Sequence, residues 1–221
     1  MNTLLCCVTL IFAYLIGSIP FGYLIAKFKG VDLTAVGSGN IGATNLGRVF
    51  GGKWFTVCLV LDACKGVLAT CIAGMILAGI LDRHTWVYFL LWISCGSAAI
   101  LGHTFSIFLK FRGGKAVATS LGVALGIFPH FTLPALITFG IWWLVLFAAG
   151  YVSLASIVGA VSFPVIYFLT HRRVALNEQM PLLIFCSLMA LLIIWRHTDN
   201  IRRLKEGTET KASFLLKRFE K

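Results

Sequence analysis

Long apolar runs constrain the fold of this chain more than any other feature of its sequence. The first run extends from about Leu4 to Ala26 without a charged side chain. A helix needs about 20 predominantly apolar residues to cross the hydrocarbon core of a bilayer. The whole chain is 59% hydrophobic and 12% charged, with a mean hydropathy of +0.92, whereas soluble domains are about 25% charged. These values predict an integral membrane protein.

The apolar runs do not alternate with a period of two, which favours membrane-spanning helices over the strands of a barrel. The length suits about seven spans of roughly 20 residues. We therefore expect an all-α integral membrane protein in which residues 1–221 form a single transmembrane domain. No basic residue precedes the first run, so we expect it to remain a span rather than be cleaved as a signal peptide. The expected spans lie near residues 4–26, 54–80, 86–102, 115–129, 131–149, 151–169 and 181–196.

The distribution of Lys and Arg predicts the orientation, because these residues collect on the cytoplasmic side of membrane proteins. With seven spans, 16 of the 19 basic residues fall on the side of the C-terminus, and only Arg83, Arg172 and Arg173 fall on the other. We expect the N-terminus outside and the C-terminus in the cytoplasm. The same rule accounts for the net charge of +11 without nucleic acid, for which no recognition module is visible. Residues 205–221 are predicted to be a basic tail on anionic lipid.

Three polar segments fall on the predicted cytoplasmic face. They are "VGSGNIGATNLGR" at 36–48, "LGHTFSIFLKFRGGKAVATS" at 101–120 and "RHTDNIRRLKEGTE" at 196–209. Each by itself could be an ordinary loop. Three segments rich in Gly, Ser, Asn, His, Lys and Arg at one interface indicate a shared polar site.

The first segment combines glycines with hydrogen-bonding side chains and one arginine. Backbone N–H groups left unshielded by glycine form concave sites that bind anions, and a guanidinium fork suits phosphate. The alternative interpretation is a flexible loop that ends in a membrane-anchoring arginine. The candidate anion-binding residues are Gly37, Ser38, Gly39, Asn40, Gly42, Thr44, Asn45 and Arg48.

In the second segment, Gly113, Gly114 and Lys115 precede a predicted helix. A helix N-terminus with glycines and a lysine is a favourable phosphate site. The segment is not a nucleotide-binding P-loop, because Leu109 and Ala116 occupy the positions that require Gly and Ser or Thr. His103, at the end of the third span, is either an interfacial residue or part of this site.

The third segment places His197 and Asn200 three residues apart, on one face of a helix. Glu209 follows at its end. The alternative is a solvated juxtamembrane helix with basic lipid contacts. Inside the second span, Asp62 and Lys65 are also three apart, and the cost of charge in a membrane predicts that they pair for structural reasons.

Several reaction classes lack their sequence signatures. There is no G-x-S-x-G nucleophile motif, no histidine is followed five positions later by aspartate, and no His/Cys cluster has zinc spacing. The seven cysteines all lie in apolar runs without a C-x-x-C pair, so we expect neither disulfides nor a metal site. We expect no cofactor. Anion binding at a membrane surface is the function class that remains.

At this point the motifs are recognisable. "GSGNIGATNLGR", "GHTFSIFLKFRGGKAVAT" and "HTDNIRRLKEGTE", in this order between predicted spans, resemble the bacterial acyl-phosphate:glycerol-3-phosphate acyltransferase family. "AYLIGSIPFGYLIAKFKGVDL", "LDACKG" and "YVSLASI" are similar to it as well, so the resemblance covers nearly the whole chain. It implies transfer of a fatty acyl group from acyl phosphate to the 1-hydroxyl of glycerol 3-phosphate, giving lysophosphatidic acid and phosphate.

The resemblance also implies residue roles. Ser38 and Arg48 become essential, and Gly113, Gly114 and Lys115 become part of the glycerol 3-phosphate and phosphate site, with His103 near it. His197 and Asn200 support activity, and Glu209 is structural. The base is His103, His197 or a substrate phosphate oxygen, and we favour the phosphate. The expected partners are acyl phosphate, glycerol 3-phosphate and membrane lipid, with no metal and no nucleic acid.

Two other functions compete with this interpretation. A transporter of phosphorylated metabolites or lipids would also need glycine-containing spans and basic loops, but transporters usually show paired repeats and polar sites at the membrane midplane. No repeat is visible here, and the polar groups gather at one interface. A membrane scaffold would leave the pattern of glycine and arginine unexplained.

Overall fold

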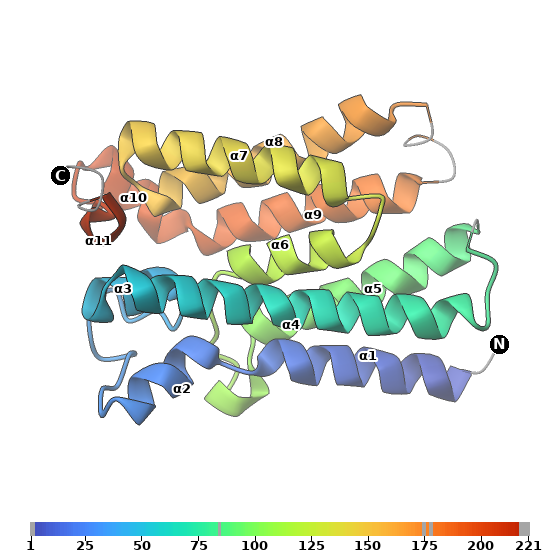
Figure 1. Ribbon diagram of the computed structural model, residues 1–221, viewed down its shortest axis with the longest axis horizontal. Helices are drawn as coiled ribbons and strands as arrows, with labels where there is room; N and C mark the ends of the chain where they lie inside the picture. The colour runs from blue at the N-terminus through green and yellow to red at the C-terminus, as the bar shows by residue number, and fades with distance from the viewer. Residues whose placement is uncertain (1–2, 84, 174–175, 177–178, 217–221) are drawn as a thin grey trace.

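Long helices run side by side along one axis and form a bundle (Figure 1). A computed structural model describes residues 3–83, 85–173, 176 and 179–216. The described helices are α1 (Thr3–Ser18), α2 (Phe21–Phe28), α3 (Ala43–Phe50), α4 (Gly52–Ala78), α5 (Trp86–Thr104), the 3₁₀ helix η1 (Ile107–Leu109), α6 (Val117–Gly126), α7 (Thr132–Ala149), α8 (Val152–His171), α9 (Met180–Arg196), α10 (Thr198–Lys205) and α11 (Ser213–Leu216). The predicted all-α multi-pass membrane fold is confirmed.

The number of full-length spans is smaller than predicted. Among the described residues, five helical segments are long and apolar enough to cross a membrane, and a sixth qualifies if α9 and α10 count as one span bent by 57°. The predicted span at 115–129 is α6, with only ten residues. At 1.5 Å per residue it is about 15 Å long, half the hydrocarbon thickness. It ends at Gly126, shortly before Pro129, and the chain then turns into α7 at Thr132.

The first span is broken at Pro20, where α1 ends and α2 begins. Proline has no N–H group and clashes with the preceding turn, so helical hydrogen bonds are lost there. Two carbonyls at the break find partners elsewhere in the chain, one in the loop after α5 and one in α4. The Ser106 hydroxyl donates to the Ser18 carbonyl at 2.6 Å, and Lys65 Nζ donates to the Ile19 carbonyl at 2.8 Å.

Lys65 also confirms the predicted pair inside α4. Its Nζ lies 2.7 Å from Asp62 Oδ1, and both side chains are almost fully buried. Close packing of α4 against α6 surrounds them. A Cβ at Gly66 or Gly122 would overlap a backbone carbonyl of the facing helix. Glycine is therefore required at both contact points, and it lets a short helix lie deep in the bundle.

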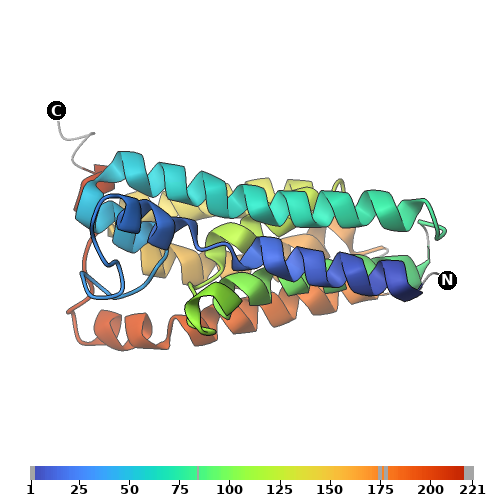
Figure 2. The same cartoon turned by 90° about the horizontal axis from the view of Figure 1, so that it is seen from below.

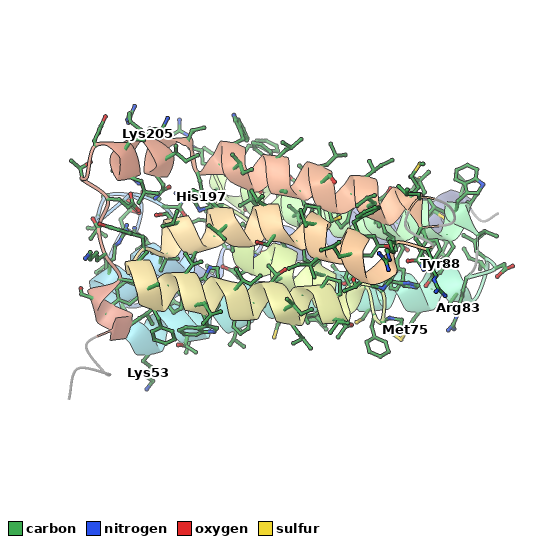
Figure 3. All side chains as sticks on the ribbon, turned by 90° about the horizontal axis from the view of Figure 1, so that it is seen from above. Lys53, Met75, Arg83, Tyr88, His197 and Lys205 are labelled. Atoms are coloured by element: carbon green, nitrogen blue, oxygen red, sulfur yellow. The ribbon has the colours of Figure 1, made fainter. Side chains whose placement is uncertain are left out.

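The two termini lie at opposite ends of the bundle (Figure 1). The long loop after α2, together with α3 and α10, lies at the end nearer the C-terminus in both views (Figures 1 and 2). Lys53, His197 and Lys205 are at this end, whereas Arg83 is at the other (Figure 3). The end of the predicted basic tail, residues 217–221, lies outside the described residues.

The described part of that tail does not lie free on a surface. The Ala212 N–H donates to the Gly150 carbonyl at 2.8 Å, and the Phe214 ring packs against Phe55 with centroids 5.7 Å apart. Glu209 and Ala212 are both buried. Glu209, Ala212 and Phe214 of the predicted tail therefore pack on protein rather than on lipid, while Thr210, Lys211 and Ser213 are exposed and the lipid-surface prediction remains untested for them.

Candidate active site

One cavity of about 180 Å³ opens among the helices and brings the three polar segments together. Most of the residues predicted from sequence contribute to its walls. They are Ser38, Asn40, Gly42, Thr44, Asn45, Arg48, His103, Lys115, His197, Asn200 and Glu209. The cavity walls do not include Gly37, Gly39, Gly113 or Gly114. Segments that are far apart in sequence therefore form one site at the end of the bundle that carries the C-terminus.

Glu209 is the centre of the polar network. Its carboxylate accepts hydrogen bonds from Ser153 Oγ at 3.0 Å, Asn200 Nδ2 at 2.8 Å and Arg203 Nε at 2.7 Å. Burial raises the pKa of Glu209, but the hydrogen bonds from Arg203, Asn200 and Ser153 outweigh it and hold the pKa below its usual value. Glu209 is therefore an anion that fixes the residues around it, as expected of a structural role.

Arg48 comes from α3 and faces the same cavity. Its Nη2 lies 3.7 Å from Glu209 Oε1 and donates to the Thr210 carbonyl at 3.3 Å. Its Nε is buried and has no hydrogen-bond partner among the described residues. Buried donors are almost always satisfied, so this guanidinium has a donor free for a ligand.

Lys115 supplies a second cation directly before α6. Its Nζ donates to Asn200 Oδ1. Burial, together with the positive charge of nearby Arg203, lowers the pKa of Lys115 to about 8, and the opposing effect of Glu209 is smaller. The first-turn N–H groups of a helix have no partners within the helix and carry partial positive charge. Ala116, Val117 and Ala118 line the cavity, so this charge faces the same space as Lys115.

His197 lies at the junction of α9 and α10 and is 3% exposed. Its Nδ1 is 2.8 Å from the Ile193 carbonyl, which only accepts, so Nδ1 carries the proton in this contact. In the neutral ring Nε2 is then an acceptor. His197 also borders the cavity.

Gly113 and Gly114, predicted to bind phosphate, direct their N–H groups to protein carbonyls in this structure. The N–H groups of Gly113 and Gly114 donate to the carbonyls of Thr104 and His103, at 3.1 and 3.0 Å. A Cβ at Gly113 would overlap the His103 carbonyl, and one at Gly114 would overlap the His103 ring. These glycines therefore let the loop pack against the end of α5, and their N–H groups are already bonded to protein.

In the loop of the first segment, at residues 36–48, backbone N–H groups are likewise bonded to protein. The Gly39 N–H donates to the Val36 carbonyl at 3.0 Å, and the Gly42 N–H donates to Asn40 Oδ1 at 2.9 Å. Asn45 Oδ1 accepts from the Ser38 N–H at 2.9 Å, while its Nδ2 donates to the carbonyls of Leu33 and Val36. Asn45 thus holds the loop in shape, and the exposed Ser38 side chain sits on a fixed backbone.

His103 belongs to a buried group that the sequence rules do not detect. Its Nδ1 lies 3.6 Å from Asp62 Oδ1, although Asp62 comes from α4, 41 positions earlier in the chain. The absence of a local His-x₄-Asp motif therefore does not exclude a His–Asp neighbourhood. The other side of the ring faces Gly114. His103 supports the loop that carries Lys115.

The sequence does not identify three further residues that hold the polar site together. Ser153 and Arg203 bind Glu209, and Arg196 Nη2 donates to the Gly113 and Gly114 carbonyls at 3.1 and 3.2 Å. Arg196 and Arg203 lie in a stretch with several other basic residues, and nothing in the neighbouring sequence distinguishes them from the others. Only the contact partners distinguish these two from their exposed neighbours.

The inner part of the cavity is apolar. It passes between α6, α7, α8 and α9 and is lined there by Leu121, Ala124, Phe139, Trp142, Phe163 and Met189, among others. A polar, cationic mouth thus continues into a hydrocarbon-lined interior. Such a shape suits a molecule with an anionic head and an apolar chain. Within the described residues, no group of three or more His, Cys, Asp or Glu side chains could hold a metal ion.

Residues 7–207 match the family described as glycerol-3-phosphate acyltransferase. This chain belongs to that family. It is 44% identical to the glycerol-3-phosphate acyltransferase of Geotalea daltonii over 91% of this chain and 95% of the relative. It is 42% identical to the Thermus thermophilus enzyme of the same name, over 92% and 93%. These relatives show that the protein is an acyltransferase enzyme.

Solved structures agree with this assignment. The fold matches a crystal structure of PlsY (YgiH), an integral membrane glycerol 3-phosphate acyltransferase, in its glycerol 3-phosphate form, with a TM-score of 0.81 and 38% identity. That match covers 93% of this chain and 94% of PlsY. The lysophosphatidic acid form of PlsY matches with a TM-score of 0.78 and 37% identity over the same shares.

Proposed function

We propose that this glycerol-3-phosphate acyltransferase uses acyl phosphate as its donor. It transfers the fatty acyl group to the 1-hydroxyl of glycerol 3-phosphate and forms lysophosphatidic acid and inorganic phosphate. One observation carries the proposal: a single cavity joins Arg48 and Lys115 to an apolar interior. The relatives named for glycerol 3-phosphate and the PlsY forms with glycerol 3-phosphate and lysophosphatidic acid support the acceptor and the product.

The two substrates share the cavity according to their polarity. The acyl chain occupies the apolar part between α6 and α9, where its removal from water is favourable. Both phosphate groups remain at the mouth. Arg48, with its unpaired Nε, and Lys115, with the α6 N-terminus, are the cations that bind them. Ser38 orients a substrate beside Arg48, and Asn200 holds Lys115 in place.

The transfer proceeds in one step. The 1-hydroxyl oxygen bonds to the acyl carbonyl carbon, the bond from that carbon to the phosphate oxygen breaks, and the hydroxyl proton passes to a phosphate oxygen. The donor is already an activated anhydride, so the protein contributes mainly positioning and stabilisation of charge on the leaving phosphate. The alternative proton acceptors are His197 and His103, which both border the cavity; Gly114 covers one part of the His103 ring.

No covalent acyl-enzyme forms in this mechanism. Nucleophilic catalysis needs a nucleophile with a base in reach. Intact-protein mass spectrometry after incubation with acyl phosphate alone tests this point. An acyl adduct that disappears when glycerol 3-phosphate is added would overturn direct transfer.

We also propose the cellular setting. The protein acts as one domain over residues 1–221 in the bacterial inner membrane, with the cavity mouth toward the cytoplasm. The basic residues at the end of the bundle that carries Lys53 and Lys205 support this orientation (Figure 3). The cytoplasm is also the compartment in which a water-soluble phosphate ester such as glycerol 3-phosphate reaches the site.

The decisive experiment uses the purified full chain in detergent. It is mixed with hexadecanoyl phosphate and glycerol 3-phosphate, and lysophosphatidic acid is measured by mass spectrometry. We expect one lysophosphatidic acid for each phosphate released. Replacing the donor with hexadecanoyl-CoA or acyl carrier protein thioester should give no product. Equal turnover with a thioester would contradict the acyl phosphate assignment.

A further inference from the structure

An aromatic cluster closes the inner end of the cavity. Phe163 of α8 lines the cavity, and its ring centroid lies 5.3 Å from that of Phe131. Phe131 is fully buried, with Tyr167 at 5.0 Å and Phe185 at 6.1 Å on its other sides. Aromatic pairs at these separations attract one another. The rings come from the residue that precedes α7, from α8 and from α9, so they form a braced wall rather than a movable side chain.

The wall stands at a defined depth. Ser153, which binds Glu209 at the polar mouth, and Phe163 lie on the same helix, ten residues apart. At 1.5 Å per residue this gives about 15 Å between the polar network and the aromatic wall. An acyl chain that starts at the mouth therefore meets Phe163 after a finite number of carbons.

Gly159 lies between these two points and borders the cavity. A Cβ added there would meet only Thr138 Cγ2 at 3.5 Å and Trp142 Cδ1 at 3.9 Å, which are ordinary contact distances. The absence of a side chain at this position is thus not demanded by helix packing. It leaves open the space through which an acyl chain would pass.

We infer that Phe163 and Gly159 determine which acyl chain lengths this protein accepts, Phe163 by ending the cavity and Gly159 by keeping its middle open. The inference rests on the proposed function, since it assigns the inner cavity to the acyl chain of the donor. A single methylene in an apolar pocket changes discrimination by about 10- to 200-fold. Residues that change the length of the cavity by several methylenes should therefore shift the selectivity between donors.

Two variants test the inference in opposite directions. The measured quantity is the ratio of kcat/KM for hexadecanoyl phosphate to kcat/KM for decanoyl phosphate. We expect Phe163→Ala to raise this ratio about tenfold or more, because the chamber lengthens. We expect Gly159→Leu to lower it by a similar factor, because the leucine side chain blocks the passage between the mouth and Phe163 and displaces more methylenes of the longer chain than of the shorter one.

Matched controls carry the same substitutions on outward-facing positions. Phe168→Ala changes a phenylalanine of the same helix that is 36% exposed. Gly140→Leu changes a glycine of α7 whose added Cβ would meet no atom within 4 Å. Both should keep the wild-type ratio. If Phe163→Ala fails to fold, as judged by its melting temperature, the ratio measured for Gly159→Leu alone tests the inference.

The possible failures are distinguishable. Wild-type protein that transfers no acyl group from either acyl phosphate would overturn the proposed function. Active wild-type protein whose ratio is unchanged in both Phe163→Ala and Gly159→Leu would overturn the inference alone, and would indicate that the chain leaves the cavity sideways into lipid. A proportional loss with both donors would overturn it as well, since that result reflects general damage.

Discussion

At the residue scale, Lys115 makes the activity depend on pH. Burial lowers its pKa to about 8, so the free enzyme carries the ammonium below this pH and loses it above. In the proposed function this charge binds phosphate. We expect kcat/KM for glycerol 3-phosphate, which reports ionisations of the free enzyme, to fall as pH rises through about 8. In Lys115→Arg, the guanidinium stays charged, and the decline should move to higher pH.

The control for this profile is Lys205→Arg, which makes the same exchange at an exposed position of α10. Its profile should coincide with that of the wild type. A wild-type kcat/KM that stays constant well above pH 8 would show that Lys115 does not bind the substrate phosphate as a cation.

Arg48 should contribute more than a typical cation, because its guanidinium is partly buried and already oriented by Glu209 and Thr210. Removing a preorganised donor to developing charge costs about 10²- to 10³-fold in kcat. We expect such a loss for Arg48→Ala, with the melting temperature little changed. Arg202→Ala is the matched control, since Arg202 forms an exposed ion pair with Asp199. Near-normal turnover of Arg48→Ala would contradict a role of Arg48 in substrate binding or catalysis.

At the element scale, the segment 209–216 holds α3 against the bundle. The Phe214 ring approaches within 2.6 Å of the place where a Gly47 Cβ would lie, and Phe214 packs on Phe55. Glu209 and Thr210, in the same segment, contact Arg48. The missing side chain at Gly47 thus leaves space for the Phe214 ring. This contact brings Glu209 and Thr210 close enough to bind Arg48 of α3.

Phe214→Ala should therefore lower both stability and turnover. Buried Phe→Ala changes cost about 3–5 kcal/mol. Phe214 is only partly buried, so we expect about 2 kcal/mol, measured as a lower melting temperature. kcat should fall more than KM rises, because Arg48 loses its fixed orientation. Phe108→Ala, at a position that is 59% exposed, should change neither. A stable, fully active Phe214→Ala would contradict this attachment.

At the scale of the whole molecule, the chain reverses direction at each long helix and at α6, so its ends lie at opposite ends of the bundle (Figure 1). The concentration of basic residues predicts that the C-terminus is cytoplasmic. A green fluorescent protein fused after Lys221 should fluoresce, whereas alkaline phosphatase at the same place should be inactive. The reverse pattern would place the cavity mouth on the outer side.

Much of this arrangement could be predicted from the sequence. Membrane insertion, helical structure and the grouping of three polar segments at one end follow from hydropathy and from the direction reversal at each span. The Asp62–Lys65 pair follows from i,i+3 spacing within one helix. Ser38, Arg48, Lys115, His197 and Asn200 were named from motifs, and all five border the cavity. These features depend on neighbours along the chain, which a sequence displays directly.

Only the tertiary structure decided how each polar group is used. The N–H groups of Gly113 and Gly114 are bound to carbonyls of α5, whereas Lys115 and the first turn of α6 face the cavity, which is why we assign phosphate binding to them in the proposed function. The approach of Asp62 to His103 and the attachment of Phe214 beside Gly47 join residues remote in sequence. A buried group takes whatever partner the packing of other helices brings to it. Local periodicity therefore determined where this chain lies and which residues meet at one end, while helix packing determined which of them remain free for a substrate.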